Sequence, residues 1–133
     1  MANVLVVSMT KSIEDAVYHA EVNELEDYYN HLECGCMDVA HRKIGGKYFD
    51  IWVDDEGLLV ENPVISAVTI APDDEDGKPR FEPMLAGNLI IANHDAEGNT
   101  TSLSRADANM IIDNIIVRIL EDGRKIPCLI CEY

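Results

Sequence analysis

Short apolar runs alternate with polar and turn-forming residues along the 133-residue chain. The run from Val4 to Val7 is apolar and mostly β-branched, which predicts a buried first strand. In residues 48–54 every second residue is apolar, as in a strand with one buried face. Gly45-Gly46 separates this segment from a second strand candidate, residues 37–42, and therefore predicts a β-hairpin.

Two other segments have the spacing of amphipathic helices. In residues 20–32 apolar side chains recur every three or four positions and acids occupy the positions between them, which predicts a helix ending at Gly35. A second helix is expected to begin at Ser104, because serine is a good N-cap, and to continue through the apolar residues Met110, Ile111, Ile112 and Ile115.

The remaining segments complete the predicted sheet. Residues 64–70 suit a short strand or a short helix, and residues 85–93 form a buried strand. Residues 116–120 and 126–130 flank Asp122-Gly123, which is a strong hairpin signal. We therefore predict an α+β fold with a mainly antiparallel sheet of five or six strands, two helices and a C-terminal β-hairpin.

The length predicts one domain over residues 1–133. Residues 72–83 contain three prolines and the acids Asp73 to Asp76, and they are expected to form an acidic loop. The hairpin over residues 115–133 is a C-terminal extension of the domain.

The charge pattern restricts the partners. The chain carries 25 acids against 10 bases, for a net charge of −15. Residues 12–41 and 48–77 contain no Lys or Arg but hold eight and nine acids, respectively. Such a surface repels nucleic acid and anionic lipid, and it attracts basic protein surfaces. We expect the partner to be the basic surface of a host protein, such as a nuclease, and expect neither direct nucleic-acid binding nor membrane binding.

The chain has no apolar run long enough to span a bilayer and no basic start typical of a signal peptide, so a cytoplasmic location is expected. Four cysteines occur as Cys34-Gly-Cys36 and Cys128-Leu-Ile-Cys131, and disulfides are rare in a reducing compartment. Only the second pair has the spacing of a structural zinc site. Its apolar neighbours favour core packing, and no cofactor is expected.

Catalytic motifs are weak. Glu24, Asp27 and His31 share one face of the first predicted helix, where they would form either a metal or proton-transfer site or a solvated acidic face. The acids Asp73 to Asp76 lack the alternating spacing of an EF-hand loop. No serine lies in a glycine elbow, and no glycine-rich phosphate loop is present. We therefore expect a non-catalytic protein.

Several short motifs occur in an order that resembles a known family. They are Val4-Leu5-Val6-Val7, Leu25 to Leu32, Asp55-Glu56-Gly57-Leu58 followed by Asn62, Leu85 to Ile91, and Glu97-Gly98 followed by Ser102-Leu103. Over residues 4–113 the chain resembles the phage and plasmid family known as domain of unknown function 3846. Cys34-Gly35-Cys36 replaces a Gly-Gly typical of relatives, and the segment from Ile115 lies outside the pattern. The resemblance implies carriage on a phage or mobile element, and it implies no activity or catalytic residues.

These observations together predict an acidic binding protein that inhibits a host defence or nucleic-acid enzyme, of the anti-CRISPR or anti-restriction type. The expected contacts are Asp54, Asp55, Glu56, Asp73, Asp74, Glu75 and Asp76, with Tyr29 or Trp52 as an apolar anchor. The alternative is a small-ligand or metal-binding domain that uses an apolar pocket or the set Cys34, Cys36, Cys128 and Cys131. A structural subunit of a larger assembly is the third hypothesis.

Overall fold

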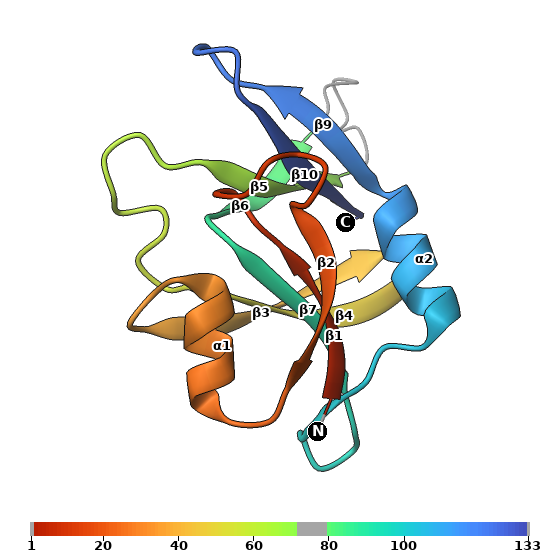
Figure 1. The fold of residues 1–133 in the computed structure, drawn as a ribbon. Coiled ribbons are helices and arrows are strands. Elements are labelled where there is room, and N and C mark those ends of the chain that lie inside the picture. Colours follow the sequence, from red (N-terminus) through yellow and green to blue (C-terminus); the bar gives the residue numbers. More distant parts are fainter. Residues whose placement is uncertain (1, 72–79, 133) are drawn as a thin grey trace.

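The computed structural model describes residues 2–71 and 80–132 of the chain (Figure 1). Its elements are β1 (Ala2–Val7), β2 (Val17–Val22), α1 (Leu25–Leu32), β3 (Met37–Ile44), β4 (Lys47–Asp54), β5 (Ile65–Ala71), β6 (Arg80–Ala86), β7 (Leu89–His94), β8 (Thr100–Thr101), α2 (Arg105–Asp113), β9 (Ile115–Ile119) and β10 (Lys125–Glu132). In the part of the chain described, no helix is long and apolar enough to cross a membrane.

The strands form one mixed sheet in the order β2-β1-β7-β4-β3-β10-β5-β6, with β8 paired to β7 and β9 paired to β10. Neighbouring strands are antiparallel except β5 and β10, which run parallel. The junction between β3 and β10 is a single residue pair, Lys43 with Glu132. The sheet therefore consists of two well-paired halves that meet at a narrow seam.

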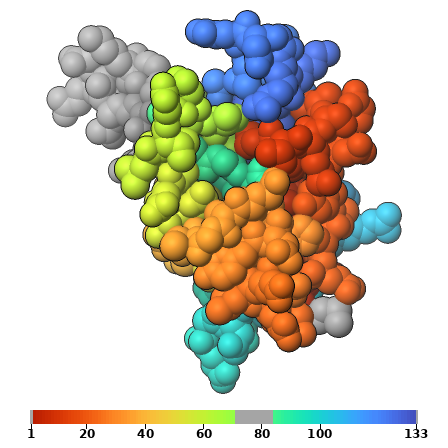
Figure 2. Space-filling view, turned by 60° about the vertical axis from the view of Figure 1, so that its left-hand side comes forward, coloured from red at the N-terminus to blue at the C-terminus, as the bar shows by residue number. Residues whose placement is uncertain are grey.

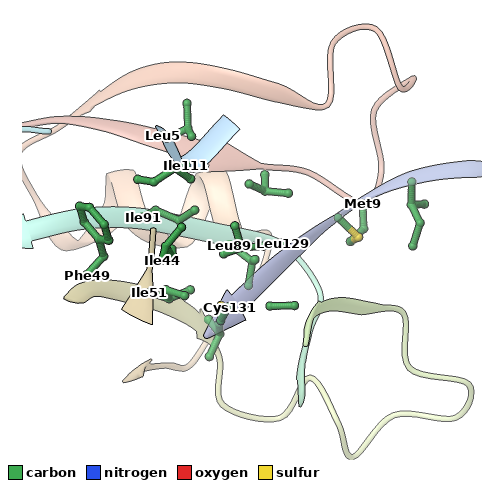
Figure 3. Close-up of a cluster of buried hydrophobic side chains, with 14 residues drawn as sticks. Leu5, Met9, Ile44, Phe49, Ile51, Leu89, Ile91, Ile111, Leu129 and Cys131 are labelled. Carbon is green, nitrogen blue, oxygen red and sulfur yellow. The ribbon is translucent and has the colours of Figure 1, made fainter. Parts of the chain in front are cut away.

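The half of the sheet made of β2, β1, β7, β4 and β3 has a separate apolar core on each face. Successive side chains of a strand point to opposite faces, so one strand contributes to both cores. Leu5 of β1 belongs to the same buried cluster as Ile111 of α2 (Figure 3). Its neighbours Val4 and Val6 belong to a second cluster with Tyr28 of α1. We call these the α2-side core and the α1-side core.

Local signals set the helix ends. Ser104 caps α2 by accepting a hydrogen bond from the Asp107 backbone N–H at 3.0 Å, which confirms the predicted start of this helix. Glu24 and Asp27 form a capping box at the start of α1. The left-handed residue that ends α1 is Glu33, with φ 55°, and not Gly35 as predicted.

The predicted five or six strands are too few, since ten strands form the sheet within the described residues. The predicted helix over residues 20–32 is wrong in its first part, which belongs to residues 17–22. These residues form β2, and all six of them pair with β1. Helical periodicity is a local signal, and here pairing with a distant strand overrides it.

The chain around residues 72–93 also differs from the prediction. The predicted strand 85–93 is divided at Gly87, whose φ of +82° ends β6 before β7 begins. The predicted loop 72–83 overlaps the first four residues of β6, and its other residues lie outside the described chain.

Residues 65–71 form a strand, which resolves the ambiguity at 64–70. The hairpins β3–β4 and β9–β10 are confirmed.

Candidate functional site

The loop between β4 and β5, residues 55–64, combines exposed apolar and acidic side chains. Leu58, Leu59 and Val60 are 49%, 81% and 54% exposed. The exposed acids that border them in the chain are Asp55, Glu56 and Glu61. Contiguous exposed apolar side chains with a charged border are typical of protein-binding surfaces.

Backbone contacts hold this loop in place. The Asp55 N–H donates to the Cys36 carbonyl at 3.3 Å, which ties the loop to the segment between α1 and β3. The Gly57 N–H donates to the Asp54 carbonyl at 3.1 Å. A Cβ atom at Gly57 would lie 2.8 Å from the carbonyl oxygen of Ala86, so only glycine allows the loop to approach β6 this closely.

A pocket of about 400 Å³ lies between the loop and the C-terminal end of α1. Figure 2 shows this side of the molecule, with the yellow-green loop beside the orange helix and the green-to-teal chain visible between them. Leu32, Val60 and Val64 supply apolar walls, Glu33 and Asp54 supply carboxylates, and Arg124 also lines the pocket. The loop surface and the pocket together form one acidic and apolar area.

A hydrogen-bond network holds Glu33 at the wall of this pocket. Its carboxylate accepts from the Thr10 hydroxyl at 2.6 Å and from the Asn88 amide at 2.8 Å. These two hydrogen bonds lower the pKa of Glu33 and keep it ionised. Asn88 is buried, accepts from the Met9 N–H at 2.8 Å and also donates to the His31 carbonyl.

The Cys34 thiol has a raised pKa. Burial is the largest cause, and the negative charges of Asp54 and Asp55 raise the pKa further. A thiol with a raised pKa is largely protonated at neutral pH and is a poor nucleophile. Asp54 and Glu33 both line the pocket described above.

The structure describes some of the residues predicted as partner contacts and not others. Asp54, Asp55 and Glu56 belong to the acidic and apolar area just described, whereas Asp73 to Asp76 lie outside the described residues. Trp52 packs against Tyr28 of α1, with ring centroids 5.3 Å apart, and Tyr29 is half-buried. Leu58 and Leu59, which the sequence did not single out as anchors, are the more exposed apolar side chains.

The four cysteines are free thiols and do not form one site. Cys131 is buried in the α2-side core, whereas Cys34 packs against the α1-side core on the opposite face of the sheet. Burial raises the pKa of Cys131 to about 11 and also raises that of Cys128. This arrangement buries the second pair and does not bring the four sulfurs together.

The predicted face of Glu24, Asp27 and His31 serves the structure of α1. Asp27 accepts the backbone N–H groups of Asn23 and Glu24 at 2.8 and 3.0 Å, and these hydrogen bonds lower its pKa. The Nδ1 atom of His31 lies 2.9 Å from the Tyr18 hydroxyl. The three side chains therefore have separate partners.

A second pocket, of about 710 Å³, lies beside the loop between β1 and β2. Its volume falls in the range of small-molecule sites. Lys11 lies over the ring of Tyr18, with its ammonium 5.3 Å from the ring centroid. Ser8, Thr10 and Glu33 also line the pocket, so it is more polar than the apolar pocket considered from the sequence.

Sequence reasoning missed a cluster of His41, Asp50 and His94 on three neighbouring strands. Asp50 is 5% exposed, and its two carboxylate oxygens lie 2.7 Å from His41 Nδ1 and 2.9 Å from His94 Nδ1. Over residues 2–71 and 80–132 this is the group in which three side chains able to bind a metal ion come together. His41 and Asp50 pair across the β3–β4 hairpin, but His94 lies 44 residues beyond Asp50 in the chain, so the strand order is needed to bring it to them.

The fold and these surfaces define a small α+β domain with one mixed sheet and a helix on each face. Residues 2–116 match the family described as Domain of unknown function (DUF3846), and the chain belongs to that family. This match confirms the resemblance inferred from the short motifs. It ends in β9, so β10 lies beyond it. Neither the curated proteins nor the solved structures contained a match to the chain.

Proposed function

We propose that this protein is a non-catalytic binding module that docks its acidic and apolar area on a basic partner surface. The observation that carries the proposal is the exposed run Leu58 to Val60 in a loop bordered by carboxylates. Apolar side chains supply binding energy when they are buried in a complex, and acidic neighbours select a cationic partner.

The partner that best fits this chemistry is the basic nucleic-acid channel of a host nuclease. Carboxylates would occupy positions that phosphates normally take, and inhibition would follow from exclusion of the nucleic acid. The net charge of −15 accelerates encounter with such a channel, and salt weakens the attraction. A role in countering host defence, in the cytoplasm of the host cell, is part of this proposal.

Two matched sets of substitutions test the docking surface. The test protein carries Asp54→Asn, Asp55→Asn and Glu56→Gln, and the control carries Glu21→Gln, Glu97→Gln and Glu121→Gln, which remove the same charge from exposed positions elsewhere. Leu59→Ala tests the apolar part. The partner is captured from host extract with the unmodified protein, purified, and titrated by calorimetry at low and high salt.

We expect the test set to weaken binding about tenfold, mainly through slower association, and the control set to have a much smaller effect. Leu59→Ala should weaken binding at both salt concentrations, because apolar burial is not screened. Nucleic acid should compete with the protein for the partner. Equal losses from the two charge sets, or an affinity that does not change with salt, would contradict the proposal.

A further inference from the structure

We propose that His41, Asp50 and His94 form a binding site for a divalent transition-metal ion, with Zn²⁺ as the ion whose ligand preferences fit best. The site is separate from the acidic and apolar area, and its existence does not depend on the docking function. Two imidazoles and one carboxylate with further positions open to solvent are a common ligand set for Zn²⁺ and Fe²⁺.

Strand pairing places the three side chains on one face of the sheet. His41 of β3 pairs directly with Asp50 of β4, and Asp50 pairs with Ala92 of β7. His94 follows Ala92 by two residues and therefore points to the same face. Each ligand thus comes from a regular strand, which holds a site more rigidly than a loop does.

The distances suit an ion placed among the three groups. The ligand atoms all lie within 4.8 Å of one another. Zinc bonds of about 2.0–2.2 Å would place neighbouring ligand atoms roughly 3.0–3.5 Å apart. The shorter separations of 2.7 and 2.9 Å therefore need to open by a few tenths of an ångström, and any wider separation, up to 4.8 Å, needs to close to this range. The imidazoles can turn to allow this, because their side chains are 62% and 49% exposed.

Metal binding changes the position of the imidazole protons and needs no other reactant. Both imidazoles present Nδ1 to the carboxylate, so each neutral ring carries its proton there when it donates to Asp50. Metal binding at Nδ1 requires the other neutral tautomer, in which that proton is on Nε2. The freed Nδ1 lone pairs and one Asp50 oxygen then become the ligands.

Burial and charge favour a cation at this position. Among the described residues Asp50 is the one buried carboxylate, and burial of a carboxylate is costly unless the charge is compensated. A divalent ion compensates it while leaving both imidazoles neutral. The nitrogen donors favour a transition-metal ion over Mg²⁺ or Ca²⁺, which prefer oxygen ligands.

The test uses the full chain, freed of metal with a chelator and titrated with Zn²⁺ by calorimetry. Co²⁺ is titrated in parallel, because its visible absorption reports nitrogen and oxygen ligation. All proteins carry Cys36→Ser, which removes the exposed thiol as a competing ligand. His41→Ala and His94→Ala are the main variants, since both side chains are exposed and their loss should spare the fold. His19→Ala is the matched control, an exposed histidine on β2.

We expect one equivalent of Zn²⁺, with affinity at least about tenfold weaker in His41→Ala and in His94→Ala and unchanged in His19→Ala. The Co²⁺ spectrum should change in the same two variants. Zinc uptake that His41→Ala and His94→Ala leave unaltered would overturn the proposal, and so would an equal loss in His19→Ala. Both outcomes are independent of partner binding, because Asp54, Asp55 and Glu56 are unchanged.

Discussion

Glu33 links three parts of the molecule through one side chain. It occupies the left-handed position that ends α1, which costs a residue with a Cβ atom about 1 kcal/mol relative to glycine. Its carboxylate accepts hydrogen bonds from Thr10, after β1, and from Asn88, before β7. These contacts offset the backbone strain and fasten the helix end to the sheet.

The lowered pKa of Glu33 predicts a pH-dependent contribution to stability. A carboxyl group whose pKa falls on folding stabilises the protein above its ordinary pKa of 4.5, and the contribution is lost as the pH falls through the lower folded value. Glu33→Gln should therefore lower the free energy of unfolding at pH 7 by about 0.5 kcal/mol, a small amount because solvent screens the exposed carboxylate.

Urea unfolding between pH 3 and pH 7 measures this effect. The unmodified protein should lose stability more steeply than Glu33→Gln below pH 4.5, and the two curves should approach each other in acid. Glu121→Gln, at an exposed position outside the helices, serves as the control for the loss of one carboxylate. Parallel curves for Glu33→Gln and the unmodified protein would rule out this role of Glu33.

At the scale of elements, the β3–β4 hairpin and α2 depend on each other. Gly45 in the hairpin turn has a φ of +59°, which glycine adopts without strain. A Cβ atom at Gly45 would also collide with the side chain of Met110 in α2. The glycine pair predicted the turn, but the contact with the helix is a feature of the tertiary structure.

Gly45→Ala should destabilise the protein by about 1–3 kcal/mol, through backbone strain and the collision with Met110. Gly46→Ala is the matched control, because Gly46 has a φ of +85° and open space around its Cβ position, so it should cost only the strain of about 1 kcal/mol. Met110→Ala should recover part of the loss in Gly45→Ala. Additive effects of the two substitutions in urea unfolding would show that turn and helix are not coupled.

At the scale of the whole molecule, β10 connects the two halves of the sheet. It pairs with β9, β5 and β3, and its side chains Ile126, Cys128, Leu129 and Cys131 are buried. The family match ends at residue 116, before this strand begins. The C-terminal segment is therefore part of the core of the chain and not an appendage to it.

Core packing by β10 predicts a strong contrast within the C-terminal hairpin. Leu129→Ala removes a fully buried side chain and should lower the free energy of unfolding by about 2–5 kcal/mol. Ile119→Ala, on β9, removes a side chain that is 69% exposed and should cost less than about 0.5 kcal/mol. Thermal and urea unfolding measure both. Similar losses for the two variants would mean that β10 does not stabilise the core as the structure indicates.

Strong local signals explain the parts of the fold that were predictable. Val4 to Val7, the Gly45-Gly46 turn, Ser104 and the Asp122-Gly123 turn each act over a few neighbouring residues. Residues 17–22 and 80–86 lack such signals, and they become strands because β1 and β5 offer them backbone hydrogen bonds.

The same distinction between local and distant contacts applies to the candidate sites. Asp54, Asp55 and Glu56 were identifiable as a run of acids, whereas His41, Asp50 and His94 meet only because β3, β4 and β7 are adjacent.

The amino-acid sequence by itself determined the α+β class, the turns, the negative charge and the family, since these depend on composition and on contacts between near neighbours. The tertiary structure alone decided the strand order, the two separate cores, the position of each cysteine and the meeting of two histidines with a buried aspartate. Those features depend on which distant strands exchange hydrogen bonds and which faces they bury, and local pattern carries little information about either.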